Sequence, residues 1–193
     1  MGVIFIIGLL LFAFDAHAQE VTHPSLQQDL LALKKLDQDA LIEKKLSQEE
    51  LLSLQTANTV KLKNLVHQYG WPSINKVGKD AAQGAWLLVQ HADNDRAWQR
   101  QALMMMEQLV VSGDIDKSNI AYLRDRLSMA ENQTQLYGSQ GRCVEKNLWQ
   151  PFTIIDSGKV EIRRSEMNMT TLPEYVSRAS NMCKNFVAKD VIK

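Results

Sequence analysis

Residues 47–66 read SQEELLSLQTANTVKLKNLV, and this stretch decides the fold class because it has the features of a long amphipathic helix. Ser47 can accept a hydrogen bond from the backbone N–H of Glu50, and the Glu50 side chain can reach back to the N–H of Ser47. This reciprocal arrangement is the capping box of a helix start. Apolar residues then follow, separated by polar ones, at Leu51, Leu54, Val60, Leu62 and Leu65.

Helical patterns extend in both directions from this segment. Upstream, an apolar residue recurs every three or four positions at Leu26, Leu30, Leu33 and Leu36, which marks a first helix. Downstream, turn-forming residues separate further helices expected at about residues 75–91, 96–111, 118–130 and 156–164, and from 171 onward. We therefore expect a mainly α protein with roughly six or seven helices around one core.

The pattern changes at Gln133. Thr134 to Tyr137 alternate polar and apolar residues, residues 138–141 supply bends, and residues 148–155 are rich in aromatic and β-branched side chains. These features predict a two-stranded β-hairpin over residues 133–155. The expected organisation is a signal peptide at 1–18, a helical pair at 19–66, and a helical core domain at 67–193 that contains the hairpin.

The N-terminus has the features of a secretory signal peptide. Val3 to Phe14 form an apolar run broken only by Gly8. Its length as a helix, roughly 18 Å, is short of the ~30 Å hydrocarbon core of a bilayer. Ala16-His17-Ala18 supplies small residues before a cleavage point at Gln19. We expect a periplasmic or secreted protein with no membrane span after cleavage near Ala18. The alternative is an uncleaved anchor, since no Lys or Arg precedes the run.

The charge balance argues against two classes of partner. Lys and Arg total 22 and Asp and Glu also total 22, so the net charge is zero. Loss of Asp15 with the signal changes this only to about +1. Because no basic stripe is present, nucleic acid and anionic membrane surfaces are poor candidates as partners.

The chain contains two cysteines, Cys143 and Cys183. In an oxidising compartment an even pair predicts a disulfide. Closing a loop of about 40 residues would stabilise the fold by roughly 3–4 kcal/mol. The alternative is a reactive thiol with a His partner, which requires one free cysteine.

Several short motifs resemble those of an uncharacterised bacterial family known only as a domain of unknown function. The resemblance covers about residues 60–175 and rests on Gly70-Trp71-Pro72, Gln90-His91-Ala92-Asp93, Ala121-Tyr122-Leu123-Arg124-Asp125-Arg126 and Gln135-Leu136-Tyr137-Gly138-Ser139-Gln140. The chain has Tyr69 where members often have His, and Ser139 where Thr is usual. The resemblance implies that these positions belong together, and it implies no reaction.

His91, Asp93 and Asp125 are the candidate catalytic residues. A carboxylate from Asp93 or Asp95 beside His91 would orient the imidazole as a base. Alternatively, His91 caps the C-terminus of its helix. Asp125 could act as a carboxylate next to Arg126 as an anion clamp, or form a structural ion pair that ties the helix to the hairpin.

Amide and aromatic side chains suggest a ligand-binding surface. If residues 135–137 form a strand, Gln135 and Tyr137 face the same side. Neutral amides and a phenol suit hydrogen bonding to a sugar or a peptide. Alternatively, Tyr137 packs on Trp71 or Trp86 and the amides satisfy buried backbone groups. The expected ligand-binding set is Trp71, Gln90, Arg126, Gln135, Tyr137 and Gln140.

Two functions follow from these residues. The first is an exported protein that binds a small polar ligand or an envelope component in a cleft between the Gln90–Asp95 turn, Asp125-Arg126 and the hairpin. The second is a hydrolase-like enzyme acting on a cell-envelope glycan or peptide. We expect no cofactor and no metal, because His23, His67 and His91 are widely separated and no phosphate-binding glycine loop is present.

Overall fold

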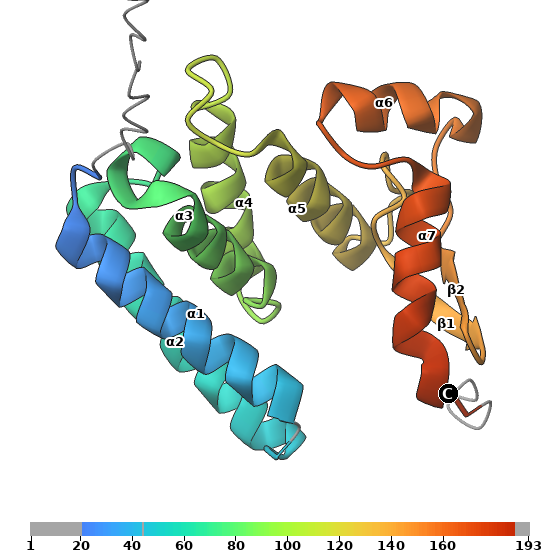
Figure 1. Cartoon of the computed structure of the whole chain (residues 1–193), viewed down its shortest axis with the longest axis horizontal. Coiled ribbons are helices and arrows are strands. Elements are labelled where there is room, and N and C mark those ends of the chain that lie inside the picture. The colour runs from blue at the N-terminus through green and yellow to red at the C-terminus, as the bar shows by residue number, and fades with distance from the viewer. Residues whose placement is uncertain (1–20, 44, 188–193) are drawn as a thin grey trace, which may run out of the picture.

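The computed structural model describes residues 21–43 and 45–187, which form a mainly helical protein (Figure 1). Within these residues the predicted mainly α fold with a small two-stranded sheet is confirmed. The α-helices are α1 (Pro24–Glu43), α2 (Gln48–Tyr69), α3 (Ile74–Gln90), α4 (Arg96–Glu107), α5 (Lys117–Ala130), α6 (Val160–Glu166) and α7 (Leu172–Ser180). The strands are β1 (Gly141–Glu145) and β2 (Leu148–Pro151), and the 3-10 helices are η1 (Ser157–Lys159) and η2 (Asn181–Asn185).

Helices α1 and α2 lie side by side and pack on α3 (Figure 1). The predicted capping box starts α2, with the Glu50 N–H donating to Ser47 Oγ at 3.2 Å and the Ser47 N–H donating to Glu50 Oε2 at 2.8 Å. Apolar side chains of α1 and α2 join those of α3, α4 and α5 in one continuous core. The helical pair is therefore part of the main body of the protein.

The buried face of α1 differs from the prediction in one place. Leu26, Leu30 and Leu33 are buried as expected, but Leu36 is 50% exposed and Asp37 is 2% exposed. With 3.6 residues per turn, the position that continues the face beyond Leu33 is 37 and not 36. A carboxylate thus occupies a core position, where it requires a polar partner.

The two strands occupy residues 141–151, a narrower range than the predicted hairpin at 133–155. They pair antiparallel, with Gly141 opposite Pro151 and Cys143 opposite Trp149. Gln135 forms an isolated bridge with Ile154, and residues 136–140 form a bend before β1 in which Gly138 has a φ of +71°. A Cβ at Gly138 would lie 2.7 Å from Ile154 Cδ1, so both the backbone conformation and the packing require glycine.

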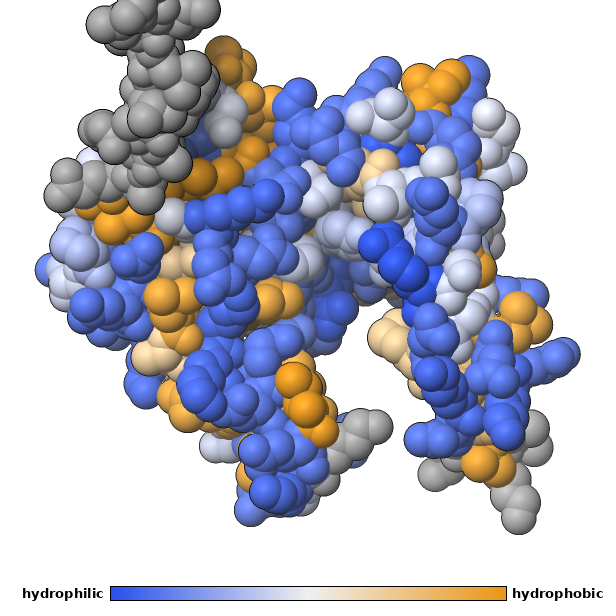
Figure 2. Space-filling model, in the orientation of Figure 1, coloured by the Kyte–Doolittle hydropathy of each residue, from blue (hydrophilic) through white to orange (hydrophobic). Residues whose placement is uncertain are grey.

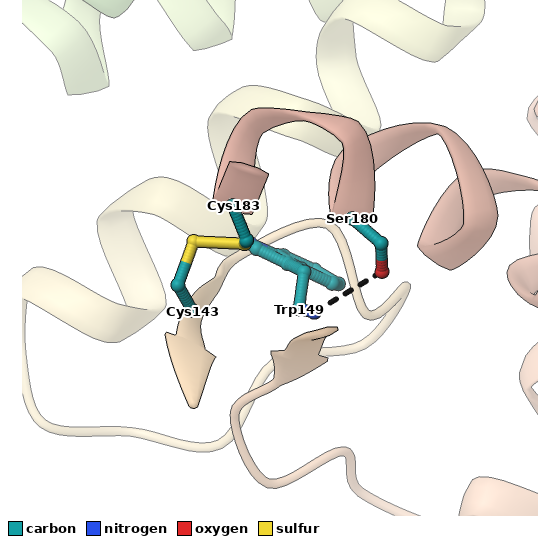
Figure 3. The surroundings of a disulfide bond; sticks show 4 residues. All are labelled: Cys143, Trp149, Ser180 and Cys183. Carbon is teal, nitrogen blue, oxygen red and sulfur yellow. Dashed lines mark hydrogen bonds between the residues drawn. A yellow bond between two sulfur atoms is a disulfide. The ribbon is translucent and has the colours of Figure 1, made fainter. Parts of the chain in front are cut away.

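Cys143 and Cys183 form the predicted disulfide, with an S–S distance of 2.01 Å (Figure 3). The chain has only these two cysteines, so the alternative of a reactive thiol is excluded. The bond joins β1 to η2, beside a small second core of Trp149, Ala179 and Cys183. The backbone N–H of Trp149 donates to Ser180 Oγ at 3.1 Å in the same place. A disulfide indicates an oxidising compartment.

No helix within residues 21–43 and 45–187 is both long and apolar enough to span a bilayer. The predicted signal peptide at residues 1–18 lies outside the described residues.

Candidate functional site

A cleft of about 670 Å³ lies between α3 and α5 on one side and β1, β2, α7 and η2 on the other. The space-filling view is hollowed between the body that contains α1 to α3 and the column formed by α7 (Figure 2). The cleft therefore separates the main core from the small disulfide-linked core. Its volume is in the range of small-molecule binding sites, about 300–1,000 Å³.

Three side-chain amides line this cleft: Gln83, Gln90 and Gln140. Gln83 accepts a hydrogen bond from Asn119 Nδ2 at 3.0 Å, and Gln140 Nε2 donates to Ser139 Oγ at 3.3 Å. Gln90 is different, because it is 6% exposed and its Nε2 has no hydrogen-bond partner in the described part of the chain. A buried donor without a partner costs about 1–3 kcal/mol.

His91 lines the cleft next to Gln90, and its partner comes from the far N-terminal helix. Its Nδ1 lies 2.7 Å from Oδ2 of Asp37 on α1. Asp37 is 2% exposed, whereas the His91 side chain is 21% exposed. A buried carboxylate that accepts from Nδ1 fixes the ring and leaves Nε2 as the free nitrogen. The predicted carboxylate-oriented imidazole thus exists, but Asp37 supplies the carboxylate and neither Asp93 nor Asp95 does.

Arg126, the second charged residue of the lining, is held by Asp93. Nε and Nη2 of Arg126 donate to the two Asp93 oxygens at 2.7 and 2.5 Å, and Arg96 Nη1 donates to the same carboxylate at 2.9 Å. Partial burial raises the pKa of Asp93, but the hydrogen bond and charge of Arg126, together with Arg96, exceed this effect and lower the pKa overall. The charge of Arg126 is therefore compensated by Asp93, and the His91 ring is held by Asp37.

Four aromatic rings form a row along the cleft. Trp86 lies 5.8 Å from Tyr122, Tyr122 lies 5.9 Å from Tyr175, and Tyr175 lies 5.5 Å from Trp149, measured between ring centroids. The two tryptophans at the ends are buried, and the two tyrosines between them are partly exposed. These separations are typical of favourable aromatic pairs.

Tyr175 is held in place by a hydrogen bond at its hydroxyl and by a cation–π contact at its ring. The hydroxyl donates to the backbone carbonyl of Ser139 at 2.9 Å, and the guanidinium carbon of buried Arg164 lies 5.1 Å from the ring centroid. Burial, with a smaller contribution from Tyr122, raises the pKa of Tyr175 to about 12. The phenol therefore stays protonated at neutral pH and keeps this hydrogen bond.

Asp125 does not line the cleft. It is fully buried on α5, and its carboxylate accepts from the backbone N–H groups of Leu136 at 2.8 Å, Tyr137 at 3.1 Å and Ser139 at 2.9 Å. These N–H groups are therefore engaged by a side chain and not by a neighbouring strand, which explains why residues 136–140 form a bend. The geometry supports a structural role for Asp125 in tying α5 to this bend.

Gln135, Tyr137 and Trp71 also lie outside the lining. Gln135 is fully buried, and its Nε2 donates to the carbonyls of Gln140 at 2.8 Å and Phe152 at 2.9 Å. Tyr137 is 5% exposed, and Trp71 belongs to the main core. The proposed ligand-binding role of these three residues has no support from their position.

The predicted residues that meet at the cleft are Gln90, His91, Arg126 and Gln140, with Asp93 behind Arg126. Sequence reasoning missed Asp37 and all four aromatic residues of the row as site components: Trp86, Tyr122, Trp149 and Tyr175. Asp37 had a detectable signal, because it is an acidic residue at the position that continues the apolar stripe of α1. Spacing alone gave no signal for Trp149 or Tyr175.

No group of three or more His, Cys, Asp or Glu side chains in the described ranges is arranged to hold a metal ion.

Comparison with known proteins yields one family. The family described as "Family of unknown function (DUF6624)" matches residues 24–184. No curated protein and no solved structure matches the chain. The match covers every residue of the cleft.

Proposed function

This chain belongs to DUF6624, a family of unknown function, and we propose that it binds a small, neutral, polar ligand in the cleft beside Gln90. The buried amide of Gln90 carries the proposal. Gln90 lines an open cleft, and its buried Nε2 has no hydrogen-bond partner among the described residues, which costs the free protein about 1–3 kcal/mol. A ligand acceptor that reached this nitrogen would recover that free energy on binding.

The character of the lining supports a neutral ligand. The lining also contains His91 and Arg126, and both side chains already have carboxylate partners in Asp37 and Asp93. The other polar groups of the lining include the hydroxyls of Ser139, Tyr122 and Tyr175 and three amides, and each amide offers both a donor and an acceptor. Such a lining favours a ligand rich in hydroxyl or amide groups over a strongly charged one.

We also propose that binding takes place outside the cytoplasm, after removal of residues 1–18. The Cys143–Cys183 disulfide supports an oxidising compartment. A periplasmic or secreted location would bring the cleft into contact with components of the cell envelope.

The experiment that tests the proposal compares Gln90→Met with Gln99→Met in the mature protein. Gln99 is also fully buried, but its Nε2 donates to the carbonyl of Val89 at 2.9 Å. Replacing Gln90 removes an unpartnered donor, so we expect unchanged stability or a gain of about 1 kcal/mol. Replacing Gln99 removes hydrogen bonds that its side chain makes in the folded protein, so it should lower stability by about 1–3 kcal/mol. Urea unfolding measures both effects.

Binding is then measured on the same proteins with a panel of neutral oligosaccharides and short uncharged peptides, using the fluorescence of Trp86 and Trp149 in the cleft. We expect at least one compound to bind the wild type and to bind Gln90→Met about tenfold more weakly. If no compound binds at millimolar concentration, or if the Gln90→Met protein binds as tightly as the wild type, the proposal is wrong.

A second candidate function is hydrolysis of the bound ligand, and the pair Asp37–His91 favours it. In this candidate Nε2 of His91 takes a proton from a water molecule that attacks the ligand, while Asp37 stabilises the charged ring. The glycosidic or amide bond then breaks, and His91 returns the proton to the leaving oxygen or nitrogen. Isolated cell-wall peptidoglycan is incubated with the wild type and with His91→Gln, and products are identified by mass spectrometry. Products from the wild type that are absent with His91→Gln support hydrolysis. Absence of products from both restricts the function to binding.

A further inference from the structure

We infer that the ligand is a saccharide, with a sugar ring seated on Tyr122 and Tyr175 and its hydroxyl groups directed toward the amides of Gln90 and Gln140. This inference rests on the proposed function and specifies the chemical class of the ligand. All four side chains line the same cleft and come from α3, α5, the bend before β1 and α7.

The aromatic row supplies the first argument. Trp86 and Trp149 are only 8% and 5% exposed, so the partly exposed pair Tyr122 and Tyr175 forms the accessible part of the row. Their ring centroids are 5.9 Å apart and the ring planes meet at 47°, which gives a shallow apolar seat. A sugar ring presents axial C–H bonds on one face, and such weakly positive C–H groups pack favourably on the negative face of an aromatic ring.

The amides supply the second argument. Neighbouring hydroxyl groups on a sugar each donate and accept hydrogen bonds, and one side-chain amide can serve both roles at once. The buried Nε2 of Gln90 has no partner in the described part of the chain, and the Nε2 of Gln140 makes a long bond of 3.3 Å to Ser139 Oγ. Hydroxyl groups are neutral, which agrees with a lining in which His91 and Arg126 already have carboxylate partners.

The charges around the row argue against a quaternary ammonium ligand, which also binds between aromatic rings. The Arg164 guanidinium already lies 5.1 Å from the Tyr175 ring centroid, and Arg126 stands in the lining. A second cation on the Tyr175 ring would be repelled by the first. The same rings accept a neutral sugar without this penalty.

The test uses isothermal calorimetry on the mature protein with four probes: N-acetylglucosamine trimer, maltotriose, N-acetyl-trialanine amide and choline. At least one of the two saccharides should bind, and Tyr122→Leu should weaken that binding about tenfold because the aromatic face is lost. Tyr122→Phe is the matched control, because it keeps the ring and removes only the hydroxyl. We expect its affinity to remain within about threefold of the wild type.

A second measurement does not depend on how the variants fold. Saturation-transfer NMR on the wild type should show magnetisation passing from the aromatic protons to the C–H protons on one face of the sugar. If N-acetyl-trialanine amide binds in a Gln90-dependent way and neither saccharide binds, the saccharide inference is wrong and the proposed function stands. If choline alone binds, or if none of the four probes binds, both the saccharide inference and the proposed function are wrong.

Discussion

Asp37 and Asp125 are both buried carboxylates, and their partners give them different roles. Asp37 accepts from the His91 ring at 2.7 Å and so positions a side chain of the cleft. Asp125 accepts from three backbone N–H groups and so fixes the bend at residues 136–139. Asp37 and Asp125 have the same residue type and are both buried. Only their hydrogen-bond partners show that Asp37 positions a side chain of the cleft and that Asp125 has a structural role.

Asp125→Asn should lower the free energy of unfolding by about 3 kcal/mol. Asparagine keeps the shape of the side chain, but an NH2 group replaces one of the two carboxylate oxygens. This NH2 group cannot accept a hydrogen bond from the backbone N–H groups that it faces. The loss is measured by urea unfolding. Glu131→Gln, which alters an exposed ion pair with Arg100, serves as control and should change stability by less than about 1 kcal/mol. Unchanged stability together with lost ligand binding would instead place Asp125 in the functional site.

At the scale of elements, α7 is attached to the hairpin at several points along one side. The disulfide joins β1 to η2, and Ser180 Oγ accepts from the Trp149 N–H (Figure 3). The Tyr175 hydroxyl donates to the carbonyl of Ser139, just before β1. Helix α7 is only nine residues long. Isolated helices of this length are marginal in water, so these attachments keep Tyr175 at the cleft.

Replacing both cysteines, Cys143→Ser with Cys183→Ser, should lower stability by about 3–4 kcal/mol because the disulfide closes a loop of about 40 residues. Ligand affinity should also fall, since the bond holds α7 beside Trp149. Thermal unfolding and ligand titration are measured on the double variant and on the oxidised wild type. The wild type with added reductant should behave as the double variant does. Equal stability of the oxidised and reduced proteins would contradict the prediction.

On the scale of the whole molecule, the helical content was predictable because it depends on local signals. The capping box at Ser47 and Glu50 and the spacing of Leu26, Leu30 and Leu33 act within a few residues. The disulfide followed from the presence of only two cysteines. The hairpin was predicted too long, because the engagement of the residue 136–139 N–H groups by Asp125 is a tertiary contact that local alternation does not reveal.

The cleft was only partly predictable for the same reason. Gln90, His91, Arg126 and Gln140 were recognised from short polar motifs, and they meet in the structure. Asp37 lies 54 residues before its partner His91 in the sequence. Tyr175 and Trp149 reach the site through the packing of α7 on the hairpin. Such long-range juxtapositions are set by the packing of whole helices, which no local pattern encodes.

The disulfide has a further consequence for a protein exposed to proteases. The connection between α6 and α7 at residues 167–171 is largely exposed, and it lies between the two cysteines along the chain. A single cut there would separate Trp149 from Tyr175 in sequence, yet both fragments would remain one covalent molecule. The nicked protein would migrate as one band on a denaturing gel without reductant and as two bands with it, and both walls of the cleft would stay together after cleavage.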